Sequence, residues 1–291
     1  MVYKFSLTDP RYRGRSIFAI FNYAFLILLM ACMLLPVIKV LADSFNADTI
    51  YGFNLIPTTP TLDGYAYVLA RGGSEYLRAF GISVLTTIMG TFLGLLLSTI
   101  GAYILIQREM PGNKFFGYMF LFTMMFNAGT IPLFLVIKAI GLYNSLWAVI
   151  FPLSMNVYNL VLMRSFFEQL PSALFEAAEI DGCTPIGTFF RIVLPLSKAA
   201  LASIGLFFAV AMWSEYVHYV IYISDTSKYN FQVKLRTLVI DDTFTLDSNF
   251  NASLNTVKNA AIIICILPFI FIYPFCQKYF MTGVTMGAVK E

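Results

Sequence analysis

The stretch EAAEIDGCTPIGTFFRIVLPL, residues 176–196, lies between two long apolar runs of the chain. Acidic residues crowd its beginning, and glycines and prolines divide the rest into short pieces. It is too polar to cross a bilayer and too long for a simple turn. We therefore predict a helix, a joint and a second helix lying outside the membrane, and this segment decides how the rest of the chain is organised.

The composition of the chain excludes an ordinary soluble domain. Of its 291 residues, 59% are hydrophobic and 12% are charged, whereas a soluble domain is about half apolar and about a quarter charged. This excess of apolar side chains cannot be buried in one core, so it must face lipid. The net charge of +3 is too small to indicate a nucleic-acid partner. The sequence predicts a multispanning protein whose surroundings are the lipid bilayer.

Crossing the hydrocarbon layer takes roughly 20 apolar residues, and a spanning segment has to be helical to satisfy its own backbone. Six stretches meet this requirement: 17–41, 79–106, 115–138, 144–163, 199–223 and 258–280. The expected fold class is an all-α membrane protein with six transmembrane helices. The expected divisions are an N-terminal segment (1–16), a six-span domain (17–281) and a C-terminal tail (282–291).

Basic residues set the expected orientation. Lys4, Arg11, Arg13 and Arg15 precede the first span, and such clusters stay on the cytoplasmic side. An even number of spans then places both termini in the cytoplasm, together with the segment 164–198. The loops 42–78 and 224–257 are expected outside. The predicted location is the bacterial cytoplasmic membrane, as a multi-pass protein.

The sequence carries none of the motifs that would make it an enzyme. It has no G-x-x-x-x-G-K-[ST] loop for ATP, no G-x-S-x-G and no H-E-x-x-H. Its single histidine and four scattered cysteines indicate neither a metal centre nor a disulfide framework. We expect no catalytic residue, no metal ligand and no cofactor in this chain.

The segment 164–198, called the elbow segment below, has clear helix boundaries. Ser172 is the expected N-cap of a first helix over 173–180, and Gly182 is expected to end it in a left-handed conformation. Thr184 is expected to cap the second helix, with Pro185 at its first position.

The second helix of the elbow segment has one predicted apolar stripe, formed by Ile186, Phe189, Phe190 and Val193 at helical spacing. Pro195 marks the return toward the membrane.

The first helix presents a small, acid-flanked face made of Glu176, Ala177, Ala178 and Asp181. Two interpretations stay open: this face docks against another protein, or the helix rests on lipid headgroups. Interfacial helices usually carry Lys and Arg on the polar face, whereas this one is acidic, which favours docking.

This pattern resembles a known motif. E-A-A at 176–178 is followed by Asp181-Gly182, by nine further residues and then by I-x-L-P at 192–195. It is similar to the EAA loop of permease subunits of bacterial ABC importers. Cys183, Phe175 and Lys198-Ala199 depart from the usual residues of that loop, and the loss of a second acid at Phe175 could weaken or re-tune the contact.

The resemblance covers nearly the whole chain. GLYNSLWAVIFP (141–152) and LMRSFFEQLPSALFEAAEIDG (162–182) resemble the carbohydrate branch, the maltose-type permeases. AVAMWSEYVHYVIYISDTSKYNFQVKLR (209–236) and QKYFMTGVTMGAVKE (277–291) resemble the lipoprotein-associated polysaccharide-import permeases.

The resemblance implies a type I importer that takes up oligosaccharides or polysaccharide-derived sugars by alternating access. Its expected partners are a second permease, a dimer of ATPase subunits that bind ATP and Mg, and an extracytoplasmic solute-binding protein. In maltose-type relatives the C-terminal tail reaches the ATPase interface; a frayed terminus is the alternative for 282–291. The resemblance makes the elbow segment a coupling helix, with these docking residues: Glu176, Ala177, Ala178, Asp181, Gly182, Ile186 and Phe189.

Residues of the transport pathway are less clearly marked. Glu215 lies in the fifth predicted span, where a carboxylate is costly and is functional by default. It could face a water-filled cavity, bind sugar hydroxyls or pair within the bundle. Trp213, Tyr216 and His218 lie around it and could either stack on sugars or form an aromatic belt. Asn127 could bind substrate or the next helix.

Two other functions stay open. An ABC permease for an amino acid, a peptide or phosphate would share the elbow segment. A secondary transporter would need facing buried acids and two symmetric halves, and Glu215 is the one available acid within the predicted spans.

Overall fold

The computed structural model describes residues 10–48, 54–71, 74–107, 109–126, 128–240 and 253–288. Within these ranges every regular element is a helix, apart from one isolated bridge between Asn46 and Pro60. The chain divides into two compact units, residues 1–68 with 243–264 and residues 69–242 with 265–291. The all-α prediction is confirmed for the described residues.

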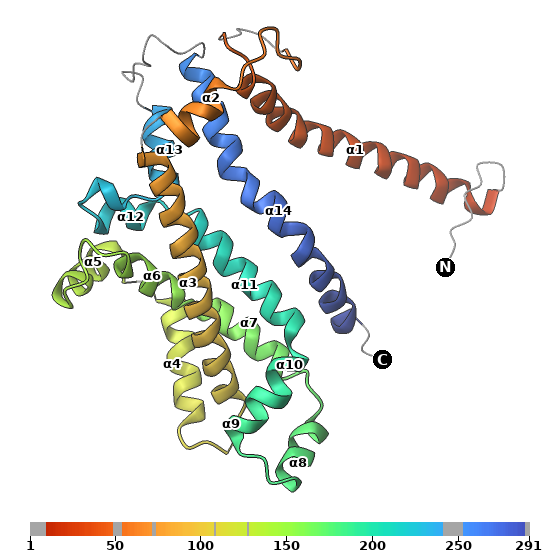
Figure 1. Cartoon of the computed structure of the whole chain (residues 1–291). Helices are drawn as coiled ribbons and strands as arrows, with labels where there is room; N and C mark the ends of the chain where they lie inside the picture. The colour runs from red at the N-terminus through yellow and green to blue at the C-terminus, as the bar shows by residue number, and fades with distance from the viewer. Residues whose placement is uncertain are drawn as a thin grey trace. The chain divides into compact units, whose positions relative to one another are not determined.

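The first unit contains α1 (Pro10–Ser44), α2 (Asp63–Ala66) and the beginning of α14 (Leu254–Ala288) (Figure 1). Asn46 forms hydrogen bonds to the segment before α2 and to the beginning of α14. Its Oδ1 accepts hydrogen bonds from the backbone N–H and the hydroxyl of Thr59, both at 2.9 Å, and its carbonyl accepts one from the Thr256 hydroxyl at 2.5 Å. The end of α1 and the start of α14 are thereby tied at one buried residue.

Three helices are long and apolar enough to cross a membrane by themselves: Ser16–Ser44, Glu75–Ile106 and Leu254–Pro274. Three further helix pairs meet the same test only when each bent pair is taken as one span. These ranges match the first, second and last predicted spans. The C-terminal helix α14 continues to Ala288, so residues 282–288 of the predicted tail are helical.

Helix α3 (Ser74–Ile106) is the centre of the second unit and packs against α6, α7 and α11. Close packing depends on glycine, because a Cβ at Gly94 would lie 2.6 Å from the Phe208 ring and one at Gly101 would lie 2.7 Å from Leu160. Spaces of this size admit no extra methyl group without displacing the neighbour.

The predicted spans 115–138, 144–163 and 199–223 are not single straight helices. Helices α4 (Asn113–Met125) and α5 (Thr130–Ala139) meet at 118°, and α6 (Trp147–Ser154) and α7 (Val157–Phe167) meet at 42°. The third breaks between α11 (Lys198–Trp213) and α12 (Val217–Tyr222). At one break Asn156 is extended and its side chain caps α7 through the N–H of Asn159 at 3.0 Å. A hydropathy profile does not detect such helix ends, because the side chains on both sides of the break are apolar.

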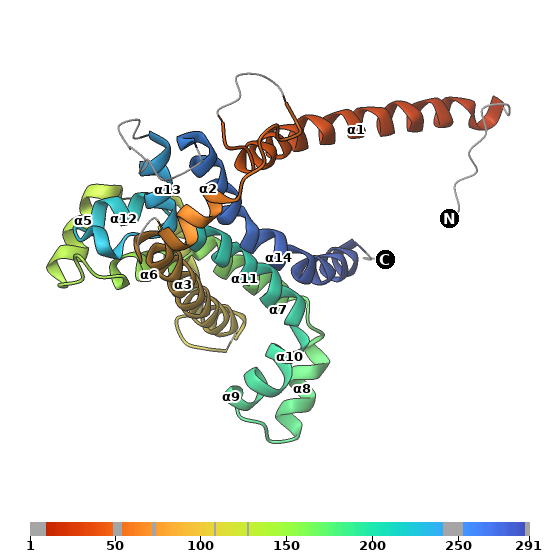
Figure 2. The ribbon, with the colours of Figure 1, turned by 45° about the horizontal axis from the view of Figure 1, so that its top comes forward.

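The segment 224–257, expected to be a polar loop, carries structure of its own. It contains η3 (Thr226–Lys228) and α13 (Phe231–Ile240), and Phe231, Val233 and Leu238 of α13 are buried. Helix η1 (Tyr67–Arg71) precedes α3. In both ribbon views α13 lies beside α12 and the beginning of α3 (Figures 1 and 2).

Candidate functional site

The first helix of the elbow segment, α8 (Ser172–Ile180), ends in a hydrogen-bonded joint. The N–H of Gly182 donates to the carbonyl of Glu179 at 3.0 Å, and the N–H of Cys183 donates to the carbonyl of Ala178 at 2.8 Å. This pair of bonds is a Schellman motif, which needs a left-handed residue, and Gly182 has φ 71°. The prediction for Gly182 is confirmed.

The beginnings of the two elbow helices differ from each other. Pro171, in extended conformation (φ −58°, ψ 131°), precedes α8, so Ser172 is the first helical residue and the prediction of a Ser172 N-cap is wrong. No side-chain cap bond forms there, because the serine hydroxyl already lies inside the first turn. Thr184 does cap α9 (Pro185–Thr188), since its hydroxyl accepts the N–H of Gly187 at 3.2 Å.

The second elbow helix continues through η2 (Phe189–Val193) and α10 (Leu194–Leu196), then turns by 81° at Ser197 into α11. The predicted apolar stripe is split. Phe189 and Val193 are buried, whereas Ile186 is 71% exposed and Phe190 is 60% exposed. Each pair is four residues apart, and the helix is rotated so that only one of the two rows faces the bundle.

The buried row anchors the elbow segment to three long helices. The rings of Phe189 and Tyr103 lie 4.9 Å apart between centroids, and the Tyr103 hydroxyl donates to the Pro185 carbonyl at 2.8 Å. Phe189 and Val193 join a buried cluster from α3, α7 and α11 that also contains these residues: Ala102, Tyr103, Met163, Phe167, Ala200, Ile204 and Phe208. The elbow segment is thereby packed directly against α3, α7 and α11.

The other side of the elbow segment is exposed and carries most of the predicted docking residues. Glu176, Ala177, Asp181, Gly182 and Ile186 are exposed. Two members of the predicted set differ, because Ala178 and Phe189 are buried within the chain.

Sequence reasoning missed Ile180, which is 87% exposed at the end of α8. The signal that could have found it is a large aliphatic residue within an acidic helix. Ile180 and Ile186 flank the joint at Gly182, so two apolar side chains stand beside the acids of this face.

Glu215 lies in the break between α11 and α12, so its prediction as part of a continuous helix is wrong. Its Oε1 accepts the backbone N–H of His218 at 2.9 Å, and the Nδ1 of His218 also lies 2.9 Å from the same oxygen. The side-chain amide of Asn230 donates to the Glu215 carbonyl at 2.6 Å. The carboxylate therefore orders the break and pairs within the bundle, one of the three roles considered for it.

The other pathway candidates have separate positions. Trp213 is 4% exposed, and its indole N–H donates to the carbonyl of Cys265 at 3.1 Å. It is an internal packing residue, and neither sugar stacking nor an aromatic belt describes its position. Tyr216 lies beneath the guanidinium of Arg236, whose Cζ is 4.3 Å from the ring centroid. Asn127 lies outside the described residues.

Asn144 binds the segment that follows α12, a role that the sequence analysis did not predict. It adopts φ 61°, and its Oδ1 accepts the N–H groups of Ser224 at 3.2 Å and Asp225 at 3.0 Å. Hydrogen bonds from Ser227 hold the pKa of the Asp225 carboxyl below its usual range. Since asparagine is among the few residues that tolerate this backbone conformation, the sequence GLYNS did contain a signal.

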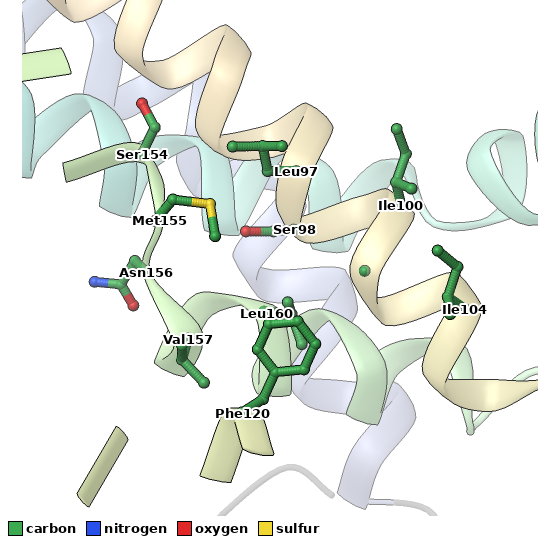
Figure 3. A pocket seen from close by; sticks show the side chains of 11 residues that line it. Leu97, Ser98, Ile100, Ile104, Phe120, Ser154, Met155, Asn156, Val157 and Leu160 are labelled. Carbon is green, nitrogen blue, oxygen red and sulfur yellow. The ribbon is translucent and has the colours of Figure 1, made fainter. Parts of the chain in front are cut away.

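A pocket of about 200 Å³ lies between α3, α4 and the break that separates α6 from α7 (Figure 3). Leu97, Ile104, Phe120 and Leu160 are among its walls. The hydroxyl of Ser154 is already committed to the carbonyls of Ile150 and Gly90. The lining is mainly apolar and offers a sugar few hydrogen-bond partners.

Comparison with known proteins agrees with this geometry. Residues 12–285 match the profile of the family described as the binding-protein-dependent transport system inner membrane component. The chain belongs to this family. It is therefore a membrane protein and a transporter component rather than an enzyme.

Individual relatives of this permease match along nearly their full length. It is 38% identical to the polygalacturonan/rhamnogalacturonan transport system permease protein YtcP of Bacillus subtilis (strain 168), over 94% of this chain and 98% of YtcP. It is also 38% identical to Protein LplC of the same organism, over 96% of each chain. Its structure matches that of a bacterial ABC transporter involved in the import of the acidic polysaccharide alginate, with a TM-score of 0.85, 29% identity and coverage of 94% and 99%.

Proposed function

We propose that this chain is a transmembrane subunit of an ATP-driven importer for oligosaccharides or polysaccharide-derived sugars. With a second permease it forms the pathway, and partner ATPase subunits supply the energy. The observation that carries the proposal is the elbow segment, which is anchored on one side and exposes a face of acids and isoleucines on the other. The names of its relatives, which concern pectic polysaccharides and alginate, support a carbohydrate substrate.

The proposed topology has six spans, with both termini and the elbow segment in the cytoplasm of a bacterium. The three long apolar helices and the bent pairs α4–α5 and α6–α7 support five of these spans. We assign the sixth to α11 with α12, although α11 meets the span test as a pair with Pro185–Leu196 across the 81° bend. The basic residues before the first span support the orientation.

In the proposed mechanism the exposed face of the elbow segment docks into a groove of an ATPase subunit, which binds ATP and Mg. Burying Ile180 and Ile186 in such a groove would supply roughly 1.5–3 kcal/mol for each side chain. Glu176 and Asp181 beside them would fix the orientation of the contact, since charges at an interface set register more than affinity.

Closure of the ATPase subunits then moves the elbow segment as one rigid piece. The movement passes to α3 through Tyr103 and Phe189, to α7 through Phe167 and to α11 through the bend at Ser197. A loaded solute-binding protein and ATP together favour the outward-facing state, because each shifts the equilibrium by its differential affinity for the two states.

The test is transport by the complex reconstituted in vesicles with its natural partners. Glu176→Lys reverses a charge on the docking face, and Gly182→Pro cannot adopt the φ of 71° at the joint. Both should insert normally and lose ATP-dependent sugar uptake. Glu109→Lys, an exposed charge reversal outside the elbow segment, is the matched control.

Three outcomes would contradict the proposal. Normal uptake by both variants at wild-type expression would remove the docking role. ATPase stimulation by an amino acid, a peptide or phosphate, and by no sugar, would indicate a permease for another nutrient. Uptake driven by a proton gradient without ATP would indicate a secondary transporter.

A further inference from the structure

The break between α11 and α12 gathers polar groups at one point of a very apolar chain. Ser214 is exposed, while Glu215 and His218 are partly exposed with their polar atoms facing each other. Discontinuous helices of this kind are where transporters expose polar groups to substrate, because irregular backbone is tolerated within a membrane only where it lines protein or a cavity.

Helix α13 is fastened onto this break and brings a cation to it. The amide of Asn230 donates to the Glu215 carbonyl, and its Oδ1 accepts the N–H of Val233 at 3.0 Å, which fixes the first turn of α13 against the break. One turn later Arg236 lies over the ring of Tyr216, the residue next to Glu215. The cation–π contact restrains the guanidinium while leaving its N–H donors at the rim.

Arg236 differs from the other cations of this region. Arg78 donates to the Ser227 carbonyl at 2.7 Å, Lys228 to the Asn144 carbonyl at 2.8 Å, and Lys234 to Glu75 at 2.9 Å. Among the residues that the structure describes, no carboxylate lies within ion-pair distance of Arg236, and its side chain is exposed. Three of these cations thus donate hydrogen bonds within the chain, whereas Arg236 rests on an aromatic ring and is exposed.

We infer that the α11–α12 break and α13 form a subsite for an anionic sugar unit, a uronate, on the transport pathway. This inference rests on the proposed function. Arg236 binds the sugar carboxylate with its planar fork of N–H donors, since guanidinium and carboxylate match bidentately. The Tyr216 ring holds the guanidinium from one side. The exposed Ser214 side chain, at the same break, supplies a hydroxyl for the sugar hydroxyls.

The subsite selects charge as well as shape. A neutral sugar of the same size would leave the guanidinium without its partner, and a site built for a charged hydrogen bond discriminates against a ligand that lacks it. One relative belongs to a transport system for polygalacturonan and rhamnogalacturonan, and one solved structure is of an importer of the acidic polysaccharide alginate, which is consistent with this chemistry.

The experiment compares two probes, trigalacturonate and its fully methyl-esterified form, which keeps the same sugar chain and replaces each charged carboxylate by a neutral methyl ester. Binding of each is measured by titration calorimetry to the full complex of permeases and ATPases in nanodiscs. The wild-type complex should bind trigalacturonate at least about 10-fold more tightly than the ester, the factor expected for one charge-assisted bidentate contact. Arg236→Gln should abolish that preference by weakening the binding of trigalacturonate and leaving the binding of the ester unchanged. Arg236→Lys should retain part of the preference.

Lys138→Gln is the matched control, because it removes the same charge from an exposed position on α5 that is not among the residues proposed for the subsite. An equal loss for both probes in Arg236→Gln, or an equal loss of preference in Lys138→Gln, would overturn the subsite. Equal affinity of the wild-type complex for trigalacturonate and its methyl ester would also overturn it. ATP-driven uptake of neutral oligosaccharides in the same preparation tests the proposed function separately, so the subsite can fail while the importer function stands.

Discussion

Tyr103→Phe tests whether the elbow segment is mechanically tied to α3. The substitution keeps the ring that packs on Phe189 at 4.9 Å and removes only the hydroxyl that donates to the Pro185 carbonyl at 2.8 Å. That carbonyl still accepts the N–H of Phe189, so it is not left unsatisfied. The cost is therefore the net value of one hydrogen bond, about 1 kcal/mol, without a desolvation penalty.

A loss of about 1 kcal/mol lowers the equilibrium constant for the anchored elbow roughly five-fold. The expected result is a partly uncoupled transporter, in which ATP hydrolysis continues and fewer sugar molecules enter per ATP. Phe189→Ala removes the ring itself, and deleting a buried phenylalanine costs about 3–5 kcal/mol. It should uncouple the transporter fully. The two effects should not add, because the residues are in contact.

The assay measures ATP hydrolysis and sugar uptake in the same vesicles and reports their ratio. Tyr118→Phe is the matched control, since Tyr118 is a 72% exposed tyrosine on α4. An unchanged ratio in Tyr103→Phe, or an equal change in Tyr118→Phe, would refute the coupling route through α3.

Three other predictions concern packing, loop structure and docking. Gly94→Ala should lower the thermal midpoint of the purified complex, because overpacking against Phe208 costs roughly 1–3 kcal/mol. Gly81→Ala should leave the midpoint unchanged, because a Cβ there meets nothing within 4 Å. Asn144→Ala should expose the segment after α12 to protease more than Asn144→Gly does, because glycine retains the φ of 61° and both lose the side-chain acceptor. Ile180→Ser should weaken capture of the ATPase subunit by roughly 10-fold or more, the value of one buried isoleucine, measured by co-purification; undiminished capture would place docking elsewhere.

The boundaries of the elbow helices could be predicted because local rules fix them. A left-handed residue at Gly182 and a hydroxyl at Thr184 act within one turn of the chain, and the structure shows both as expected. The rule failed at Ser172, where the preceding proline already supplies the extended residue before α8.

The breaks and the direction of the side chains could not be predicted in the same way. Glu215 lies in a gap within a run whose hydropathy is continuous. The gap is held by His218 of α12 and by Asn230, which directly precedes α13. Trp213 resembles a belt residue until the carbonyl of Cys265, 52 residues away, is placed beside it.

Composition and the long apolar runs determined that this chain is a helical membrane protein, because so many apolar side chains can face only lipid and a run of about 20 residues satisfies its own backbone there as a helix. The spacing around Gly182 determined that it carries two short helices separated by a left-handed joint. Tertiary structure decided which row of that helix is buried, since Phe189 and Ile186 are equally apolar and differ only in whether Tyr103 stands opposite them. Two rows of equal hydrophobicity do not reveal which neighbour each will meet, and contact with that neighbour is what separates the buried row from the exposed one.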